Sequence, residues 1–358
     1  MHIRNLNLKR TGDNMKVLWN NDGVEFLKKF KPRLVVAPLA VQKMDLFWDI
    51  VEYIGYPEVF LVSECTEDNF SKVYNFKEKV AAFGGGKAID TGKAALYAGF
   101  DFVSIPTTLT CCAAASNHTV INNPDGSYKR TLPKTHYPNA VIIIKEFFEN
   151  LPRQQITAGV ADAVAKYFEM KIGVTWLNSI SLYKKDAKKL ESNYSSMVAK
   201  AQNILSYFAR KKGPLHITDN MIKKCVIEPA FGFVTVAHAI ADALAHFYPL
   251  SLHGNRVSLG IEIMIDWAIK NKLANVQLKR RWETIAQKYS LPRLLREIAF
   301  EHVHNTNSSY VSVHPLAKKQ KNFSFEEFVN KLFDPNSTFP QIKELKTSFK
   351  QFVFFKEN

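Results

Sequence analysis

The second half of the sequence carries three residues with the chemistry of metal ligands. Asp162 and His238 each lie in an apolar stretch typical of a buried helix, and His253 directly precedes another such stretch, residues 257–267. An unpaired carboxylate is costly to bury, and one carboxylate with two imidazoles is a common open ligand set for a catalytic divalent metal. These residue types therefore predict a metal site formed by Asp162, His238 and His253.

Each of these residues also has a structural interpretation. A single histidine on an apolar helix face is more commonly a hydrogen-bonded core residue, and Asp162 could cap a helix that begins after Gly159. His246 follows His238 by about two helical turns and competes with His253 as a ligand. The separations along the chain are long, so the residues alone do not prove that the ligands converge.

A glycine turn in the first half has the composition of a phosphate-binding site. The expected strand 79–83 runs into the glycines 84–86 and then into a helix over about 88–98. Glycines let the backbone approach a phosphate, and the start of the next helix offers N–H groups and its positive dipole end. Lys87 adds a cation there, and Asp90 either caps the helix or binds a polar group of a cofactor. A tight turn without a ligand explains the three glycines alone equally well.

The loop 106–116 is a second candidate for a cofactor contact. It follows the expected strand 101–105 and contains four hydroxyl side chains among small residues. In open parallel sheets, ligands bind at the carboxyl ends of the strands. The composition therefore suits a cofactor-lining loop, and an ordinary polar loop remains the alternative.

Alternating strands and helices must position these candidates. Beyond Leu151, strand-like runs nearly vanish and helical periodicity dominates, so we place a boundary there. We predict an α/β domain with a Rossmann-like parallel sheet over residues 1–150, which binds nucleotide, and a helical domain over 151–358, which binds metal and substrate. The expected strands are 33–37, 58–63, 79–83, 101–105 and 140–144.

Composition restricts the class of protein. The net charge is +15, but the basic residues occur in short runs without interleaved aromatic residues, which argues against a nucleic-acid partner. The four cysteines form no Cys-x-x-Cys pair, which argues against a thiolate zinc site and fits a reducing cytoplasm. Since no run of about 18 apolar residues occurs, we expect a soluble cytoplasmic protein without a membrane partner.

Taken together, these motifs resemble the iron-containing alcohol dehydrogenase/glycerol dehydrogenase superfamily. Its wider fold group, the dehydroquinate synthase-like fold, includes dehydroquinate synthase and glycerol-1-phosphate dehydrogenase. The resemblance covers roughly residues 79–267. It rests on the segments 84–93, 106–108, 158–163 and 237–240, followed by His253-Gly254.

The resemblance implies a role for each candidate residue. The glycines would hold the pyrophosphate of NAD or NADP, the loop after the next strand would line the dinucleotide site, and zinc is favoured over iron or another divalent metal. The implied cofactor-binding residues are Gly84, Gly85, Gly86, Lys87, Asp90, Thr107, Thr108 and Ser116. The implied catalytic residues are the metal ligands Asp162, His238 and His253, together with Cys112.

Four positions depart from the patterns of the superfamily. Lys166 stands where iron-dependent members have a fourth ligand, a histidine, and it either pairs with Asp162, meets an acidic substrate or extends to solvent. Cys112 replaces the aspartate of glycerol dehydrogenases and is similar to the hydroxycarboxylate branch, which favours a 2-oxo or 2-hydroxy acid. Asn255 replaces a glutamate. Pro38 ends the first strand in place of the usual aspartate or glycine, so the sequence does not indicate whether the cofactor is NAD or NADP. The N-terminal segment and the last 90 or so residues resemble the superfamily poorly.

The resemblance implies a metal-dependent, NAD(P)-linked oxidoreductase that acts on the CH–OH group of a small alcohol, polyol or 2-hydroxy acid. The alternatives are a sugar-phosphate cyclase of the dehydroquinate synthase type, glycerol-1-phosphate dehydrogenase, and a binding protein without turnover. The cyclases usually have glycine where this chain has Lys93, which favours the dehydrogenase. A small-molecule substrate and a homo-oligomeric assembly are also implied.

Overall fold

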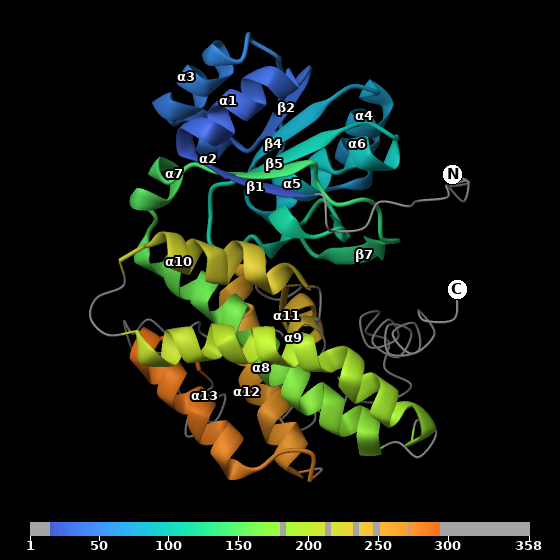
Figure 1. Ribbon diagram of the computed structural model, residues 1–358, viewed down its shortest axis with the longest axis vertical. Coiled ribbons are helices and arrows are strands. Elements are labelled where there is room, and N and C mark those ends of the chain that lie inside the picture. Colours follow the sequence, from blue (N-terminus) through green and yellow to red (C-terminus); the bar gives the residue numbers. More distant parts are fainter. Residues whose placement is uncertain are drawn as a thin grey trace. The chain divides into compact units, whose positions relative to one another are not determined.

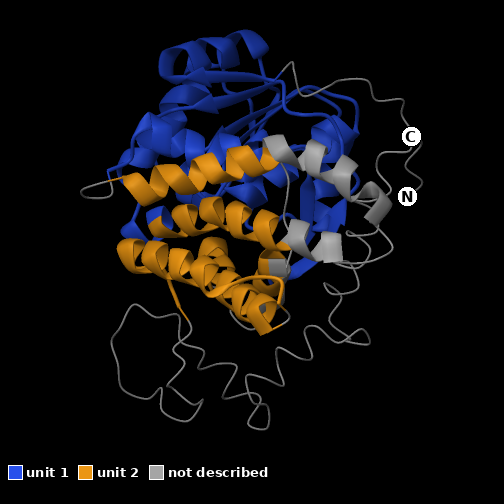
Figure 2. Ribbon diagram, turned by 60° about the horizontal axis from the view of Figure 1, so that its bottom comes forward, with its two compact units in different colours: residues 1–156, 214–232 blue, residues 157–213, 233–358 orange. Residues whose placement is uncertain are grey.

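The computed structural model describes residues 15–179, 184–211, 216–231, 236–245, 251–270 and 272–293. The chain forms two compact units, coloured separately in Figure 2. Unit 1 comprises residues 1–156 and 214–232, and unit 2 comprises residues 157–213 and 233–358. Segment 214–232 thus packs with unit 1, although it follows the boundary predicted after residue 150.

Unit 1 is built on a six-stranded parallel sheet with the order β1-β8-β5-β4-β2-β3. Its central strands are buried along their whole length because helices cover both faces, which explains their continuous apolar sequence. The predicted fold class is confirmed. The strands are β1 (Lys16–Trp19), β2 (Leu34–Ala37), β3 (Glu58–Leu61), β4 (Val80–Gly84), β5 (Phe102–Pro106) and β8 (Ala140–Ile143).

The helices of unit 1 lie on two sides of this sheet. Helices α1 and α3 lie on one side, and α4 and α6 lie on the other (Figure 1). We expected a single helix over 88–98, but the structure has two helices there. The first ends at Gly92 and the second begins at Ala94. The helices are α1 (Asn20–Phe30), α2 (Leu39–Gln42), α3 (Asp45–Tyr53), α4 (Glu67–Phe76), α5 (Gly86–Gly92), α6 (Ala94–Tyr97) and α7 (Glu146–Glu149).

Three strands of unit 1 were not predicted. β1 has only four residues, and β6 (Thr119–Asn122) pairs with β7 (Tyr128–Leu132) in a separate antiparallel hairpin. These segments are short and partly polar, so their hydrophobic pattern is too weak to distinguish a strand from a loop. Unit 1 also contains the 3₁₀ helix η2 (Cys112–Ala115), α10 (Asp219–Ile222), the π-helical turn η4 (Lys223–Ile227) and the 3₁₀ helix η5 (Glu228–Phe231).

Within its described residues, unit 2 consists of helices (Figure 1). Its central helix is α8, in which all residues from 156 to 170 are buried. Such a helix must pair its charged side chains inside the protein, since they cannot reach water. The helices are α8 (Arg153–Ser179), α9 (Lys184–Arg210), α11 (Val236–Ala245), α12 (His253–Lys270) and α13 (Val276–Tyr289).

None of the described helices combines the length and the apolar character needed to span a bilayer. His246, the competing ligand candidate, falls outside the described part of the chain, as do the residues after 293.

Candidate functional site

The buried helix α8 carries three charged residues on one face. Asp162, Lys166 and Glu169 are spaced four and three residues apart, so they follow one another along the helix. All three are buried, with 3%, 1% and 0% of their surface exposed. This row of charges is the foundation of the candidate site in unit 2.

The three predicted metal ligands converge on this row. One ligand atom from each of Asp162, His238 and His253 lies within 4.8 Å of the other two. Nε2 of His238 is 3.1 Å from Oδ1 of Asp162, and the two imidazole rings have their centroids 5.4 Å apart. One carboxylate oxygen and two imidazole nitrogens at this separation are a donor set that fits a divalent metal.

Two glycines of α12 make this convergence sterically feasible. A Cβ atom at Gly254 would lie 1.9 Å from the carbonyl oxygen of Ala158, one helical turn before Asp162. A Cβ atom at Gly260 would lie 2.2 Å from the carbonyl oxygen of Ala237, the residue before His238. Because glycine has no side chain, α12 contacts the backbones of both other helices. The contact at Gly254 also places His253, the first residue of α12, against α8.

Glu169 is a functional candidate that the sequence analysis missed. Its Oε1 accepts a hydrogen bond of 3.1 Å from the backbone N–H of His238, and its Oε2 lies 2.8 Å from Nδ1 of the same residue. The second approach is a close contact between the carboxylate and the ring nitrogen. A carboxylate on the far nitrogen of a metal-ligating imidazole fixes the orientation of the ring. The available signal was a second acidic residue, seven positions after Asp162, in the same apolar helix.

The electrostatics of the cluster follow from its burial. Burial alone would raise the pKa of Asp162, but the hydrogen bond with His238 and the charge of Lys166 outweigh it and hold the pKa low. Burial would likewise lower the pKa of His238, but Glu169 and the hydrogen bond with Asp162 raise it to about 9. Burial lowers the pKa of His253 to about 3. His253 is therefore neutral at physiological pH, the form in which imidazole binds metals.

The glycine turn of unit 1 brings together part of the predicted cofactor set. Gly84 has φ +141°, and a Cβ there would lie 3.0 Å from Cβ of Ala88 and 3.0 Å from Cδ of Pro38. The turn itself therefore requires glycine at this position. The backbone N–H of Thr107 donates a hydrogen bond of 3.1 Å to the carbonyl oxygen of Gly84. A Cβ at Gly85 would lie 3.1 Å from Cγ2 of Thr108, so the two turns meet at the ends of β4 and β5.

Gly86 differs from the other two glycines. The nearest atom to a Cβ placed there is the Cβ of Ala113 at 3.9 Å, an ordinary contact, and its φ lies outside the left-handed region. Packing therefore gives no reason for a glycine at this position. An uncrowded backbone at the start of α5 is what a cofactor phosphate would need in order to approach closely.

Among the predicted cofactor-binding residues, Asp90 and Ser116 contact a buried lysine of the protein itself. Both bind Lys93, a lysine with 0% exposure that the sequence analysis did not treat as a site residue. Nζ of Lys93 lies 2.8 Å from Oδ1 of Asp90 and 3.2 Å from Oγ of Ser116, and the other carboxylate oxygen accepts a hydrogen bond from Val120. The carboxylate and the hydroxyl thus hold a buried cation beneath the turn.

Two further candidates lie in unit 1. Lys87 forms an ion pair with Glu64, which leaves about half of the lysine side chain exposed. Cys112, predicted to contact substrate, is the first residue of η2 and is partly exposed.

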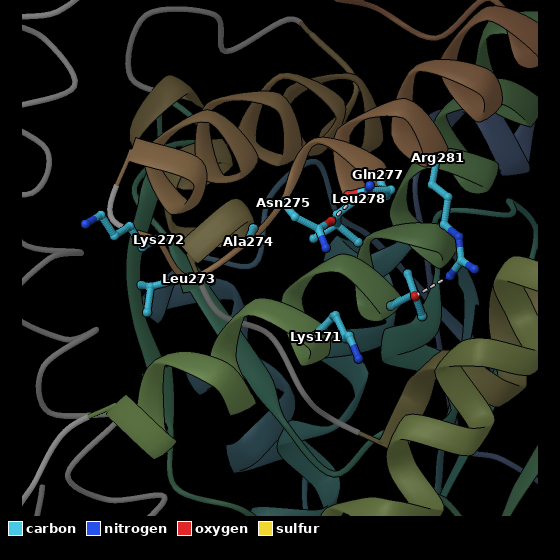
Figure 3. A pocket seen from close by; sticks show the side chains of 9 residues that line it. Lys171, Lys272, Leu273, Ala274, Asn275, Gln277, Leu278 and Arg281 are labelled. Carbon is cyan, nitrogen blue, oxygen red and sulfur yellow. Dashed lines mark hydrogen bonds between the residues drawn. The ribbon is translucent and has the colours of Figure 1, made fainter.

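A cavity of about 510 Å³ in unit 2 does not contain the metal-ligand cluster. It is lined by Tyr167 and Lys171 of α8, by residues 272–275, and by Gln277, Leu278 and Arg281. Figure 3 shows that Lys272 points away from Lys171 and Arg281. The guanidinium of Arg281 donates a hydrogen bond of 2.6 Å to the hydroxyl of Tyr167. The basic side chains of this cavity do not converge on one point, so we assign no ligand to it.

Sequence comparison finds relatives with two different enzyme names. The glycerol dehydrogenase of Thermotoga maritima is 25% identical over 266 residues, which are 67% of this chain and 69% of the relative. A 3-dehydroquinate synthase from a Nitratiruptor species is 31% identical over 226 residues, which are 60% of this chain and 58% of the relative. This chain therefore spans less than two thirds of the second relative. No family model matches the chain.

Comparison of structures finds glycerol dehydrogenases and alcohol dehydrogenases. A probable glycerol dehydrogenase from Sinorhizobium meliloti superposes with a TM-score of 0.59 at 16% identity, over 95% of this chain and 97% of that one. An iron-containing alcohol dehydrogenase from Thermotoga maritima superposes with a TM-score of 0.58 at 14% identity, over 88% and 96%. The chain is thus similar in sequence to a glycerol dehydrogenase and to 3-dehydroquinate synthases, and it has the fold of glycerol dehydrogenases and iron-containing alcohol dehydrogenases.

Proposed function

We propose that the protein is a metal-dependent, NAD(P)-linked oxidoreductase that acts on the CH–OH group of a small alcohol, polyol or 2-hydroxy acid. The observation that carries this proposal is the convergence of the buried Asp162 and His238 with the partly exposed His253 within 4.8 Å. The similarity to a glycerol dehydrogenase and to solved alcohol dehydrogenases supports the dehydrogenase reaction.

The residues of unit 2 would hold and orient the metal. Asp162, which the cluster keeps ionised, and the neutral ring of His253 would be ligands without any change of protonation. Glu169 would fix the ring of His238 so that Nε2 faces the ligand atom of Asp162. A bound divalent metal supplies Lewis-acid polarisation of a substrate oxygen, which lowers the pKa of an alcohol. We favour zinc, because Lys166 stands at the position of the fourth ligand of iron-dependent members.

The residues of unit 1 would hold the cofactor. The glycines 84–86 leave the backbone accessible, and Thr107 and Thr108 lie beside them. A nicotinamide cofactor supplies the hydride acceptor, so this chain need only bind and orient it. Lys93, Asp90 and Ser116 would support the turn from beneath.

A cofactor assay tests this proposal. Zinc-loaded protein is incubated with NADH or NADPH and a panel of 2-oxo acids, aldehydes, dihydroxyacetone and dihydroxyacetone phosphate, and absorbance is followed at the reduced nicotinamide band. We expect turnover with at least one substrate and its loss in Asp162→Ala. Asp266→Ala, which removes a partly exposed carboxylate of α12 that pairs with Lys279, serves as the matched control.

The second candidate is a cyclase that acts on a sugar phosphate. It is favoured by one observation, the 31% identity to a 3-dehydroquinate synthase. A cyclase would release inorganic phosphate from its substrate without net oxidation of the cofactor. Phosphate release that requires Asp162, together with no consumption of NADH or NADPH, would decide for the cyclase and against the dehydrogenase.

A further inference from the structure

Lys166 places a positive charge directly beside the proposed metal ligands. Its Nζ lies 3.2 Å from Nε2 of His238, and the same ring nitrogen lies 3.1 Å from Oδ1 of Asp162. A ring nitrogen either donates one hydrogen or accepts one. The carboxylate of Asp162 accepts a hydrogen bond, so it requires a hydrogen on this nitrogen. The ammonium of Lys166 donates a hydrogen bond, so it requires a lone pair on the same nitrogen. His238 therefore cannot satisfy both neighbours at once.

A divalent metal would use the same atoms as Lys166. An imidazole binds a metal through the lone pair of its ring nitrogen, and a carboxylate binds it through an oxygen. On His238 that lone pair belongs to Nε2, the atom within 3.2 Å of Nζ of Lys166. The chain thus carries a cation of its own at the ligand atoms that the metal needs.

The charge count of the cluster points the same way. Metal binding requires both imidazoles to be neutral, and in that state the carboxylates of Asp162 and Glu169 and the ammonium of Lys166 leave one net negative charge. A divalent ion changes this to one net positive charge in a buried site, where unbalanced charge is costly. A neutral side chain at position 166 would instead leave the site balanced when the metal is bound.

We propose that Lys166 is an internal counter-ion that lowers the metal affinity of the site, because its ammonium competes with a divalent ion for Asp162 and His238. This inference rests on the metal site of the proposed function. It makes Lys166 a positioning residue that sets how much of the protein carries metal at a given free-metal concentration.

Metal titration tests the inference without reference to turnover. The full chain is stripped with a chelator, and Zn²⁺ affinity is then measured by competition with a chromophoric chelator. We expect Lys166→Gln to bind Zn²⁺ about 10- to 100-fold more tightly than the parent, the range typical of groups next to metal ligands. Lys166→Arg keeps the charge and should stay close to the parent. Lys171→Gln, an exposed lysine of the same helix, is the matched control and should not change the affinity.

The outcomes separate this inference from the function on which it rests. Equal or weaker binding by Lys166→Gln, with stoichiometric binding by the parent, would overturn the inference and leave the metal site standing. No binding by either protein would overturn both. If far-ultraviolet circular dichroism shows that Lys166→Gln does not fold, Lys166→Met replaces it, since an apolar chain of similar length fills the same space. The same increase in affinity is required of that variant.

Discussion

Each unit of the protein contains a lysine one helical turn after an aspartate, and the two lysines have different surroundings. In unit 1, Lys93 follows Asp90 and contacts three oxygen atoms, from Asp90, Ser116 and the backbone of His118. In unit 2, Lys166 follows Asp162, and its hydrogen-bond contact among the described residues is a nitrogen of His238. Both are almost fully buried.

This difference indicates that Lys93 is a structural cation, whereas Lys166 would act on the proposed metal ligands. A buried ammonium with three oxygen acceptors is satisfied and ties the loop after β5 to helix α5. An ammonium against an imidazole nitrogen is satisfied only when that nitrogen has a free lone pair. The same pair of residue types on a helix thus supports a turn in unit 1 and lies against the proposed metal ligands in unit 2.

The glycines of the two units differ in the same manner. Gly84 has a backbone conformation that the turn after β4 requires, so its role is local in the sequence. Gly254 and Gly260 are part of a helix, and they allow α12 to touch residues about 96 and 23 positions earlier in the chain, Ala158 and Ala237. Unit 1 therefore builds its turn locally, whereas unit 2 depends on contacts between distant segments.

The largest effect that we expect comes from breaking the buried pair of unit 1. Lys93→Met leaves the carboxylate of Asp90 buried without its cation, which should lower the free energy of unfolding by about 3–5 kcal/mol. Lys87→Met removes a half-exposed pair with Glu64 and should cost only about 0–1 kcal/mol. Urea denaturation measures both. Similar small losses in the two variants would show that Asp90 does not depend on Lys93.

Removing the charge of Glu169 should weaken zinc binding at the proposed metal site more than it weakens the fold. In Glu169→Gln the ring of His238 loses the carboxylate beside Nδ1, and Zn²⁺ affinity should fall about 10- to 100-fold. Glu262→Gln is the control, since Glu262 is an equally buried carboxylate of unit 2 that binds Arg293. If Glu262→Gln lowers the zinc affinity as much as Glu169→Gln does, Glu169 has no specific role.

Substituting the glycines separates local from long-range roles. In Gly254→Ala the new methyl group meets the backbone of α8, so we expect a loss of about 1–3 kcal/mol in stability and weaker zinc binding. Gly84→Ala should cost a comparable amount of stability because of its φ, but it should leave zinc binding unchanged. Thermal unfolding and zinc titration of the two variants test this. Unchanged zinc affinity in Gly254→Ala would contradict our account of how the ligands converge.

The smallest effect on stability is expected at Gly86. Gly86→Ala places its Cβ at an ordinary contact distance, so the free energy of unfolding should change by no more than about 0.5 kcal/mol. If this glycine serves a cofactor phosphate, the variant should nevertheless bind NADH or NADPH more weakly, as measured by quenching of protein fluorescence. Unaltered cofactor binding would remove Gly86 from the proposed cofactor site.

Much of the fold was predictable because its signals are local. The strands at 34–37, 80–84 and 140–143 are continuous apolar runs, and the change to helical periodicity after Leu151 agrees with the helices of unit 2. The strand at 16–19 and the hairpin over 119–132 were missed, since four or five partly polar residues carry too little pattern. The split of the helix after β4 at Lys93 was missed as well.

The sequence by itself determined which residues could bind metal and which turn could receive a phosphate, because residue chemistry and short-range spacing are written in it. Only the tertiary structure decided that Asp162, His238 and His253 meet, since their meeting depends on glycine-mediated contacts of α12 with α8 and α11. It also decided that Glu169 faces His238 and that Lys166 faces Nε2 of the same ring. These contacts join residues about 70 positions apart, and no local periodicity encodes them.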